Sequence, residues 1–301
     1  MIDQARRLRE MVRAQAVEGS GAPQAGVPAA KSAARKARSI AVTSGKGGVG
    51  KTNIALMLSV GLTRLKKKVL LLDADLGLAN VHILFGIAPQ ATLSHVVEGE
   101  KSLQDVICSG PANFDILPGA SGLERMANLG QTQLAALLEA FARVENDYDF
   151  MVIDTSAGIG ATTTTFAAAA DLNVLVLTPE PTSFSDAYAM VKVLREKNVK
   201  RIGGIVNMAG SDREGRDSFD RLNTLVVKFL RDPLQLLGIL PFEKEVSRTI
   251  KHQKVFMLEH PRHVVSARIQ SACRMICGLP EPAHRGFFAG LIHRAGKDVN
   301  V

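Results

Sequence analysis

Several features that define whole classes of protein are missing from this sequence of 301 residues. It has no tryptophan, and no apolar run reaches the roughly 18 residues that a helix needs to cross a bilayer. The cysteines number only three, an odd set, so a disulfide framework is not expected. Cys273 and Cys277 would share one face of a helix, but no further Cys or His stands at ligand spacing. We therefore favour buried core residues over a metal site.

Positive charge is unevenly distributed along the chain. The 37 Lys and Arg residues exceed the 29 Asp and Glu residues, which gives a formal net charge of +8. Residues 1–38 contain eight basic and three acidic residues, and residues 281–301 contain three and two. A domain that binds DNA usually concentrates basic charge on its folded surface, because neutralising phosphates supplies most of the affinity. The nearly neutral body of the chain therefore argues against direct DNA binding.

The chain divides into four parts by composition. Residues 1–17 place apolar side chains at helical spacing and contain nothing like the apolar core of a signal peptide, so we expect a short amphipathic helix in a cytoplasmic protein. Residues 18–37 are rich in Gly, Ala, Pro and Ser, which predicts a flexible linker. Residues 38–280 form the expected folded domain, and residues 281–301 form a separate C-terminal segment.

Strand and helix patterns alternate between residues 38 and 280. Short apolar runs predict strands at residues 39–43, 69–72, 114–117, 150–153, 172–177, 202–206 and 235–240. Apolar residues at helical spacing predict helices at residues 51–65, 131–144, 183–196, 217–229 and 264–277. Continuous apolar strands separated by helices of this length indicate βαβ units. We therefore expect a single α/β domain whose mostly parallel sheet carries helices on both faces.

A glycine-rich segment follows the first expected strand and opens the first expected helix. It consists of Gly45, Lys46, Gly47, Gly48, Val49, Gly50, Lys51 and Thr52, and it matches the pattern GxxxxGK(S/T). Glycines allow backbone N–H groups to wrap a phosphate chain, and the helix N-terminus adds positive potential. In this pattern Lys51 reaches the β- and γ-phosphates, and Thr52 binds Mg²⁺. The segment predicts a P-loop NTPase.

Acidic residues follow two of the expected strands, at the edge where a parallel sheet binds its ligands. Asp154 closes the strand at residues 150–153 and suits the Walker B position, which holds Mg²⁺ directly or through water. Asp73 and Asp75 follow the strand at residues 69–72. A solvated acidic turn is the alternative interpretation of that pair.

Lys46 is a second lysine inside the glycine-rich segment, which an ordinary P-loop does not need. In this respect the chain resembles the MinD/ParA class of ATPases, with their deviant Walker A signature. The resemblance implies a homodimer around ATP, in which Lys46 reaches the partner's phosphates as an arginine finger does elsewhere. It also implies that Asp75 orients or deprotonates the attacking water. The residues expected around the magnesium ion are Thr52, Asp73, Asp75 and Asp154.

The same resemblance indicates how the base is bound. Asn207 follows a late strand and looks like the adenine-contacting Asn of the class. The other wall of the pocket would consist of Pro241, Phe242 and Glu243. Asn53, the residue after the P-loop, is expected to line the nucleotide as well. The sequence has no NKxD guanine motif, so ATP is favoured over GTP.

Within that class the chain is more similar to the flagellar number regulators of the FlhG/FleN (YlxH) family. The similar segments are Lys51-Thr52-Asn53, Asp154 to Ile159, Pro179 to Ser183, Asp186 to Ala189, and Asp3 to Arg9, which matches DQAxxLR. In the family this last motif stimulates a GTPase of the FlhF type, and Gln4 would assist catalysis there. The candidate partner-binding residues are therefore Asp3, Gln4, Leu8 and Arg9. A merely solvated extension is the alternative for this helix. The family also implies a flagellar transcription activator as a partner.

The C-terminal segment groups apolar side chains on one side of an expected helix. They are Phe287, Phe288, Leu291 and Ile292. Basic residues flank them, which is the composition of a peripheral membrane anchor. One copy should bind lipid weakly, because ordering a short helix offsets much of the burial, whereas two copies in an ATP dimer would bind together. The alternative is a helix docked on its own domain, and the two states can alternate.

These inferences lead to one main hypothesis. The chain is expected to be a slow, dimerising ATPase switch, dependent on ATP and Mg²⁺, that regulates flagellar number or placement. It would act on an FlhF-type GTPase, on the transcription activator and on the inner face of the cell membrane. The alternatives are a ParA-type ATPase that partitions DNA or cargo, and an adaptor that binds ATP without hydrolysing it. An iron–sulfur carrier is a weaker option, because it needs more cysteines.

Overall fold

The computed structural model describes residues 36–75, 91, 93–118, 131–280 and 286–298. The expected N-terminal helix and nearly all of the expected linker, including the candidate partner-binding residues between Asp3 and Arg9, lie outside the described residues. The division of the chain into four parts therefore stays a prediction.

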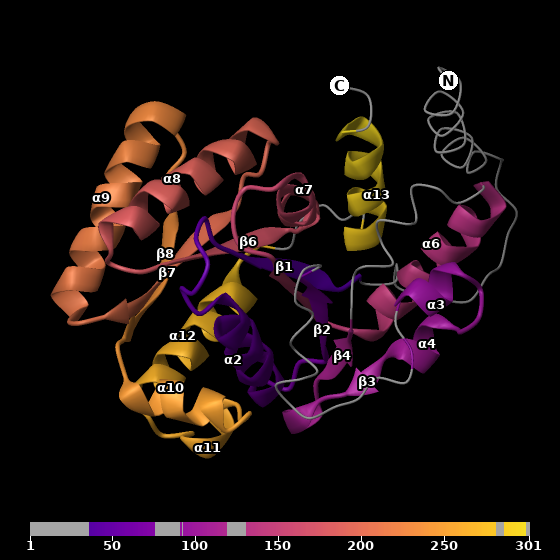
Figure 1. Ribbon diagram of the computed structural model, residues 1–301, viewed down its shortest axis with the longest axis horizontal. Helices are drawn as coiled ribbons and strands as arrows, with labels where there is room; N and C mark the ends of the chain where they lie inside the picture. The colour runs from indigo at the N-terminus through magenta and orange to yellow at the C-terminus, as the bar shows by residue number, and fades with distance from the viewer. Residues whose placement is uncertain (1–35, 76–90, 92, 119–130, 281–285, 299–301) are drawn as a thin grey trace, which may run out of the picture.

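An eight-stranded sheet forms the centre of the domain (Figure 1). Its strands are β1 (Arg38–Thr43), β2 (Val69–Ala74), β3 (Cys108–Ser109), β4 (Asp115–Leu117), β5 (Phe150–Thr155), β6 (Leu172–Leu177), β7 (Ile202–Ala209) and β8 (Gln235–Pro241). The spatial order is β3-β4-β2-β5-β1-β6-β7-β8, and every neighbouring pair is parallel except β3 and β4. The α/β fold with a mostly parallel sheet is confirmed.

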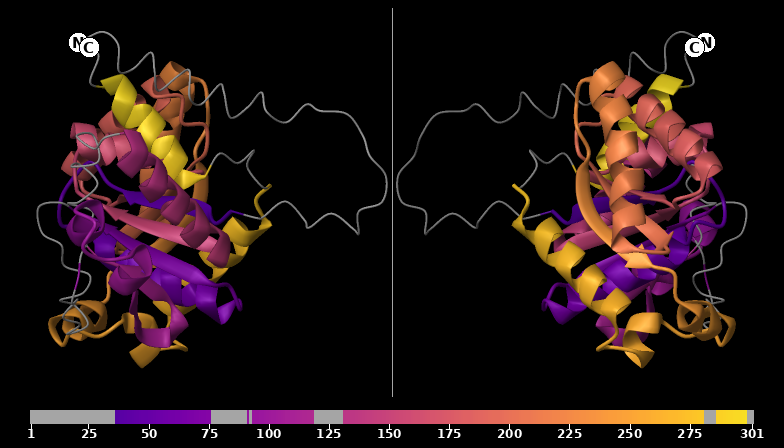
Figure 2. Two further views of the ribbon diagram at one scale, coloured as in Figure 1. Left: turned by 90° about the vertical axis from the view of Figure 1, so that its right-hand side faces the viewer. Right: turned by 90° about the vertical axis from the view of Figure 1, so that its left-hand side faces the viewer.

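Helices cover both faces of the sheet, as the side views in Figure 2 show. On one face lie α2 (Lys51–Arg64), α11 (Phe256–Glu259) and α12 (Val264–Gly278), with α10 (Lys244–Lys251) beside α11. On the other lie α3 (Leu93–Val97), α4 (Leu103–Val106), α6 (Gln131–Asp147), α7 (Ala161–Ala169), α8 (Pro181–Glu196), α9 (Asp212–Leu230) and α13 (Phe287–Asp298). A short 3₁₀ turn, η2 (Pro111–Asn113), precedes β4.

The strands are buried on both faces, so their side chains enter two separate apolar clusters. In β2, Leu70 and Leu72 contribute to the cluster under α6 and α7, whereas Val69 and Leu71 contribute to the cluster under α2 and α12. This two-sided burial explains why the strands are continuous apolar runs rather than alternating ones. Cys273 is fully buried in the second cluster, which confirms its interpretation as a core residue.

Several functional residues lie inside strands rather than after them. β2 continues through Asp73 to Ala74, β5 continues through Asp154 to Thr155, and β7 continues through Asn207 to Ala209. The predicted ends of these three strands were therefore two or three residues too short. A polar side chain ends the apolar run on which the prediction rests. The strand itself continues as long as its backbone forms hydrogen bonds with a neighbouring strand, as β2 does with β5.

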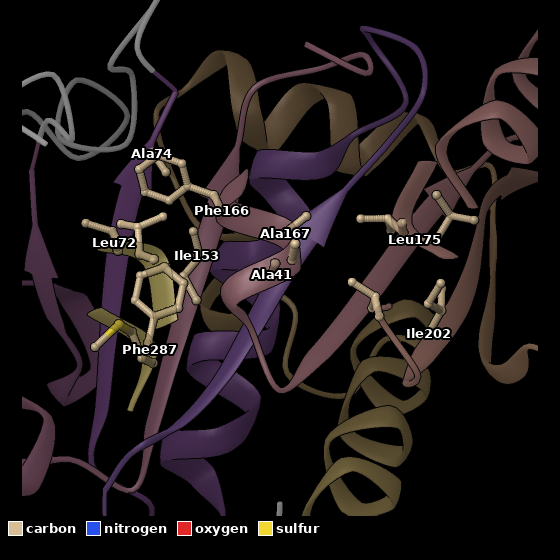
Figure 3. Packing of buried hydrophobic residues seen from close by; sticks show 14 of the residues in the cluster. Ala41, Leu72, Ala74, Ile153, Phe166, Ala167, Leu175, Ile202 and Phe287 are labelled. Atoms are coloured by element: carbon tan, nitrogen blue, oxygen red, sulfur yellow. The ribbon is translucent and has the colours of Figure 1, made fainter. Parts of the chain in front are cut away.

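The C-terminal helix α13 is docked on the domain's own surface, against α6 and α7 (Figure 1). Phe287 and Phe288 are each 1% exposed, and Leu291 is also buried. The Phe288 ring stacks on Phe141 of α6, with ring centroids 3.8 Å apart. Figure 3 shows Phe287 reaching the sheet, in the same apolar cluster as Ile153 and Leu72. The structure therefore shows the docked alternative, and the membrane anchor stays a prediction that requires α13 to leave; the Ile292 side chain lies outside the described residues.

A buried carboxylate holds the first turn of α13. Glu145 of α6 is 1% exposed, and its Oε1 accepts a hydrogen bond of 2.8 Å from the backbone N–H of Phe288. Burial raises the pKa of Glu145, while the N–H groups at Phe288 and Phe287 and the charge of Lys36 oppose that rise. Glu145 therefore satisfies donors that a helix N-terminus otherwise leaves unpaired.

Candidate functional site

The glycine-rich segment forms the turn between β1 and α2. Gly50 is the N-cap of α2, with φ at 92° and ψ at 21° in the left-handed region that favours glycine. Ser44 precedes the segment, and its hydroxyl donates to the Lys46 carbonyl at 2.8 Å. The N–H of Gly158, in the loop after β5, donates to the Ser44 carbonyl at 2.9 Å. These bonds hold a loop that leads into a helix N-terminus, the arrangement that binds phosphate groups.

Asn207 anchors the far side of this loop. Its Nδ2 donates to the Val49 carbonyl at 2.8 Å, which connects β7 to the P-loop. A Cβ atom built on Gly50 would lie 2.5 Å from that same Nδ2. Position 50 therefore requires glycine for two reasons: its backbone angles lie in the left-handed region, and a Cβ atom would clash with Asn207.

Replacing Gly50 by alanine is expected to destabilise the nucleotide-free protein. The left-handed backbone costs about 1–2 kcal/mol for an L-residue, and losing the Asn207 hydrogen bond adds about 1 kcal/mol. Gly48 is the matched control, because its φ of +79° is similar but its Cβ would meet nothing within 4 Å. Urea unfolding should show a larger loss of unfolding free energy for Gly50→Ala than for Gly48→Ala. Equal losses would contradict the contact with Asn207.

Carboxylates from two neighbouring strands meet beside the P-loop. β2 and β5 pair in a register that sets Asp73 opposite Asp154, and both are 1% exposed. Burial raises the pKa of Asp154 to about 7, although the charge of Lys51 and a hydrogen bond from Thr52 oppose the rise. Within the described part of the chain, Asp154 Oδ1 has no hydrogen-bond partner.

This carboxylate arrangement suits a magnesium ion. Mg²⁺ prefers oxygen ligands, and a hydroxyl with one or two carboxylates is the usual protein contribution beside phosphates. Thr52 and Asp154 are already in contact, and among the residues that the structure describes no donor reaches the other, buried oxygen of Asp154. A cation here would satisfy that oxygen and offset the charge of the carboxylates, so the residues present fit the group.

Asp75 stands just after β2 at the edge of this cluster. Its backbone N–H donates to Asp73 Oδ1 at 3.3 Å, and its own Oδ1 accepts a 2.8 Å bond from the Ser156 hydroxyl. Asp75 was predicted from the sequence as a site residue, whereas Ser156 was not. Their contact joins positions 81 residues apart, which no local motif reveals.

Lys46 is partly exposed and contacts the start of α8. Its Nζ donates to Glu180 Oε2 at 2.8 Å and to Thr182 Oγ1 at 2.9 Å, both at the start of α8. The side chains of Lys46 and Glu180 are 38% and 64% exposed. An ion pair as exposed as this contributes at most about 1 kcal/mol. Lys46 can therefore exchange this contact for another at low cost.

A hollow beside the P-loop collects the residues expected to contact the base. The residues that line it are Gly50, Asn53, Met57, Asn207, Met208, Pro241, Phe242, Glu243, Val246, Ser247, Ile250 and Val265. Phe242 is 54% exposed and Met208 is 39% exposed, so apolar surface is open at the mouth of the hollow. All five residues predicted for this pocket are present. The contributions of Met57, Met208, α10 and α12 were missed, because no motif marks them.

A strand, a glycine-rich loop, a helix and carboxylates on the adjoining strands define the class of the P-loop NTPases. The family described as an AAA domain matches residues 37–202. The antiactivator FleN of Pseudomonas aeruginosa is 40% identical over 85% of this chain and 92% of its own length. The flagellum site-determining protein YlxH of Helicobacter pylori is 32% identical over 85% and 90%. The chain belongs to the FleN/YlxH family of MinD/ParA-class ATPases, and it hydrolyses ATP.

Solved structures agree with this assignment. The MinD cell division ATPase of Pyrococcus furiosus is 26% identical, with a TM-score of 0.64 over 81% of this chain and 99% of that one. The MinC:MinD complex of Aquifex aeolicus gives a TM-score of 0.66 at 24% identity, over 83% of this chain and 100% of that chain, which shows the fold alone. No helix in the described part of the chain is long and apolar enough to cross a membrane.

Proposed function

We propose that this protein is an ATP-dependent dimerising switch that regulates the number or placement of flagella. The observation that carries the proposal is Lys46, a second P-loop lysine with a 38% exposed side chain that makes solvent-exposed contacts at the start of α8. The names of its relatives, an antiactivator and a flagellum site-determining protein, support the flagellar role.

ATP would bring two copies face to face across their P-loops. In each copy Lys51 and the backbone N–H groups of the P-loop bind the β- and γ-phosphates, while Lys46 leaves Glu180 and reaches the partner's phosphates. Mg²⁺ held by Thr52 and the carboxylates would neutralise phosphate charge. Asp75 orients the attacking water and accepts its proton. Hydrolysis then removes the γ-phosphate that joins the two copies.

The hollow beside the P-loop accounts for the choice of ATP. Adenine is flat and apolar on its faces, and the exposed Phe242 and Met208 side chains offer a matching surface. Asn207 supplies an amide next to the base edge, in addition to its bond to Val49. These contacts support adenine binding without a guanine-specific carboxylate.

The two ends of the chain would make membrane binding and partner activation depend on the bound nucleotide. α13 would leave its contacts with α6 and α7 and insert Phe287, Phe288, Leu291 and Ile292 into the membrane surface, where a dimer provides two copies. The segment from Asp3 to Arg9 would act on an FlhF-type GTPase. The ATPase body would bind the flagellar transcription activator.

Counting flagella on cells that lack the gene tests the biological role. We expect the number per cell to rise, or their placement to change, and the wild-type gene to restore the original pattern. A gene that encodes the Lys51→Ala variant, expressed at the same level, should fail to restore the original pattern, because the variant no longer binds the nucleotide. An unchanged count and placement in the deletion strain would overturn the flagellar proposal and leave the ATPase assignment intact.

A further inference from the structure

The Ser156 hydroxyl is aimed at the carboxylate expected to handle the attacking water. Its Oγ donates a 2.8 Å hydrogen bond to Asp75 Oδ1. An ionised carboxylate can only accept hydrogen bonds, and a hydrogen bond to a charged acceptor is among the stronger ones in proteins. The bond holds Oδ1 and restricts rotation of the whole carboxylate.

The backbone around Ser156 is fixed on both sides. The Thr155 hydroxyl donates to the Val42 carbonyl at 2.9 Å, and the Gly158 N–H donates to the Ser44 carbonyl at 2.9 Å. Both acceptors lie on β1 or the residue just after it, at the entry to the P-loop. Ser156 therefore belongs to a short bridge whose position depends on the loop that wraps the phosphates.

The register of the sheet explains why this serine and this aspartate meet. β2 and β5 pair in parallel from Val69 and Phe150 up to Ala74 and Thr155. One step further along both strands lie Asp75 and Ser156. Ser156, the first residue after β5, therefore lies beside Asp75, and it is only half-buried, so a water can reach the pair.

We propose that Ser156 is a positioning residue that aims the Asp75 carboxylate at the attacking water. It keeps its own proton throughout and acts through Asp75 rather than through direct contact with the phosphates or the attacking water. Its contribution is orientation, because a general base must be held within hydrogen-bond reach of the proton it accepts. The inference rests on the proposed role of Asp75, and it adds a dependence of that role on the bridge to the P-loop.

Steady-state ATP hydrolysis by full-length Ser156→Ala, Ser156→Thr and Asp75→Asn tests the proposal. We expect Ser156→Ala to lower kcat about tenfold, the usual effect of losing one charge-assisted hydrogen bond. KM for ATP and dimer formation with a non-hydrolysable analogue should stay within about twofold, since nucleotide binding uses other groups. Ser156→Thr should restore kcat, because it returns the hydroxyl at a half-buried position. Ser218→Ala, on the exposed side of α9, is the control for serine loss in general.

A double variant that carries Ser156→Ala and Asp75→Asn tests whether Ser156 acts through Asp75. If Ser156 acts through Asp75, then Ser156→Ala should cause no further loss in an Asp75→Asn background. An unchanged or increased kcat in Ser156→Ala, or equal changes in kcat and KM, would overturn the positioning role. Wild-type kcat in Asp75→Asn would instead overturn the proposed role of Asp75 itself.

Discussion

Replacing Lys46 by alanine is expected to lower kcat for ATP hydrolysis by about 10³-fold or more. A basic group supplied across an interface stabilises the charge that develops on the transferred phosphoryl group, and its loss typically costs about 10³ to 10⁵ in rate. Binding of ATP to the monomer should change little, because Lys46 contacts Glu180 and Thr182 rather than the P-loop's own phosphate cradle. Phosphate release and equilibrium nucleotide binding measure the two effects separately.

The same variant is expected to stay monomeric with a non-hydrolysable ATP analogue, whereas the wild type should be a dimer by light scattering. Lys68→Ala is the control for charge, because it removes one exposed lysine away from the site. Glu180→Gln is the control for the contact, because it weakens the ion pair of Lys46 without removing the lysine, and dimerisation should be equal or stronger. A Lys46→Ala protein that dimerises and hydrolyses ATP like the wild type would refute the switch.

The parts of the site that could be predicted from the sequence are those that depend on local order or on sheet topology. The P-loop is one continuous segment, so its role follows from residues 45–52 alone. Asp73 and Asp154 meet because the carboxyl ends of parallel strands share one edge of the sheet. No side-chain distance was needed for either conclusion.

The parts that could not be predicted depend on contacts between distant segments. Ser156 and Asp75, or Lys46 and Glu180, are neighbours only because of the register of strands and the entry angle of a helix. α7 was missed for another reason: its Thr- and Ala-rich sequence is buried over most of its surface and shows no polar face. α10 has only eight residues, too few to give a clear period.

The docked position of α13 predicts that loss of its contacts with α6 will release it. Phe141→Ala removes the ring that stacks on Phe288 but leaves α13 itself unchanged. Burial of an aromatic ring is worth several kcal/mol at most sites, so the docking equilibrium should shift by about tenfold or more. We expect the ADP-bound variant to bind anionic vesicles in co-sedimentation much better than the wild type. Truncation before Arg285 should abolish the gain.

Phe219→Ala provides the matched control for this experiment. Phe219 is a buried phenylalanine of α9 in the same helix layer, so its loss should cost similar stability without freeing α13. If hydrogen exchange shows α13 unprotected in Phe141→Ala and vesicle binding is still absent, the membrane role is wrong. If α13 remains protected, the stacking contact does not control docking.

Glu145 gives the same docking equilibrium a dependence on pH. Because burial raises its pKa, the docked state binds a proton more tightly than a released state in which Glu145 meets water. Docking should therefore strengthen as the pH falls through the range between the ordinary and the raised pKa, and vesicle binding by the wild type should weaken. Glu145→Gln keeps an acceptor for the Phe288 N–H and removes the buried charge. That variant should dock at least as well as the wild type at neutral pH and lose this part of the pH dependence, which would trace the effect to one carboxylate rather than to the lipid.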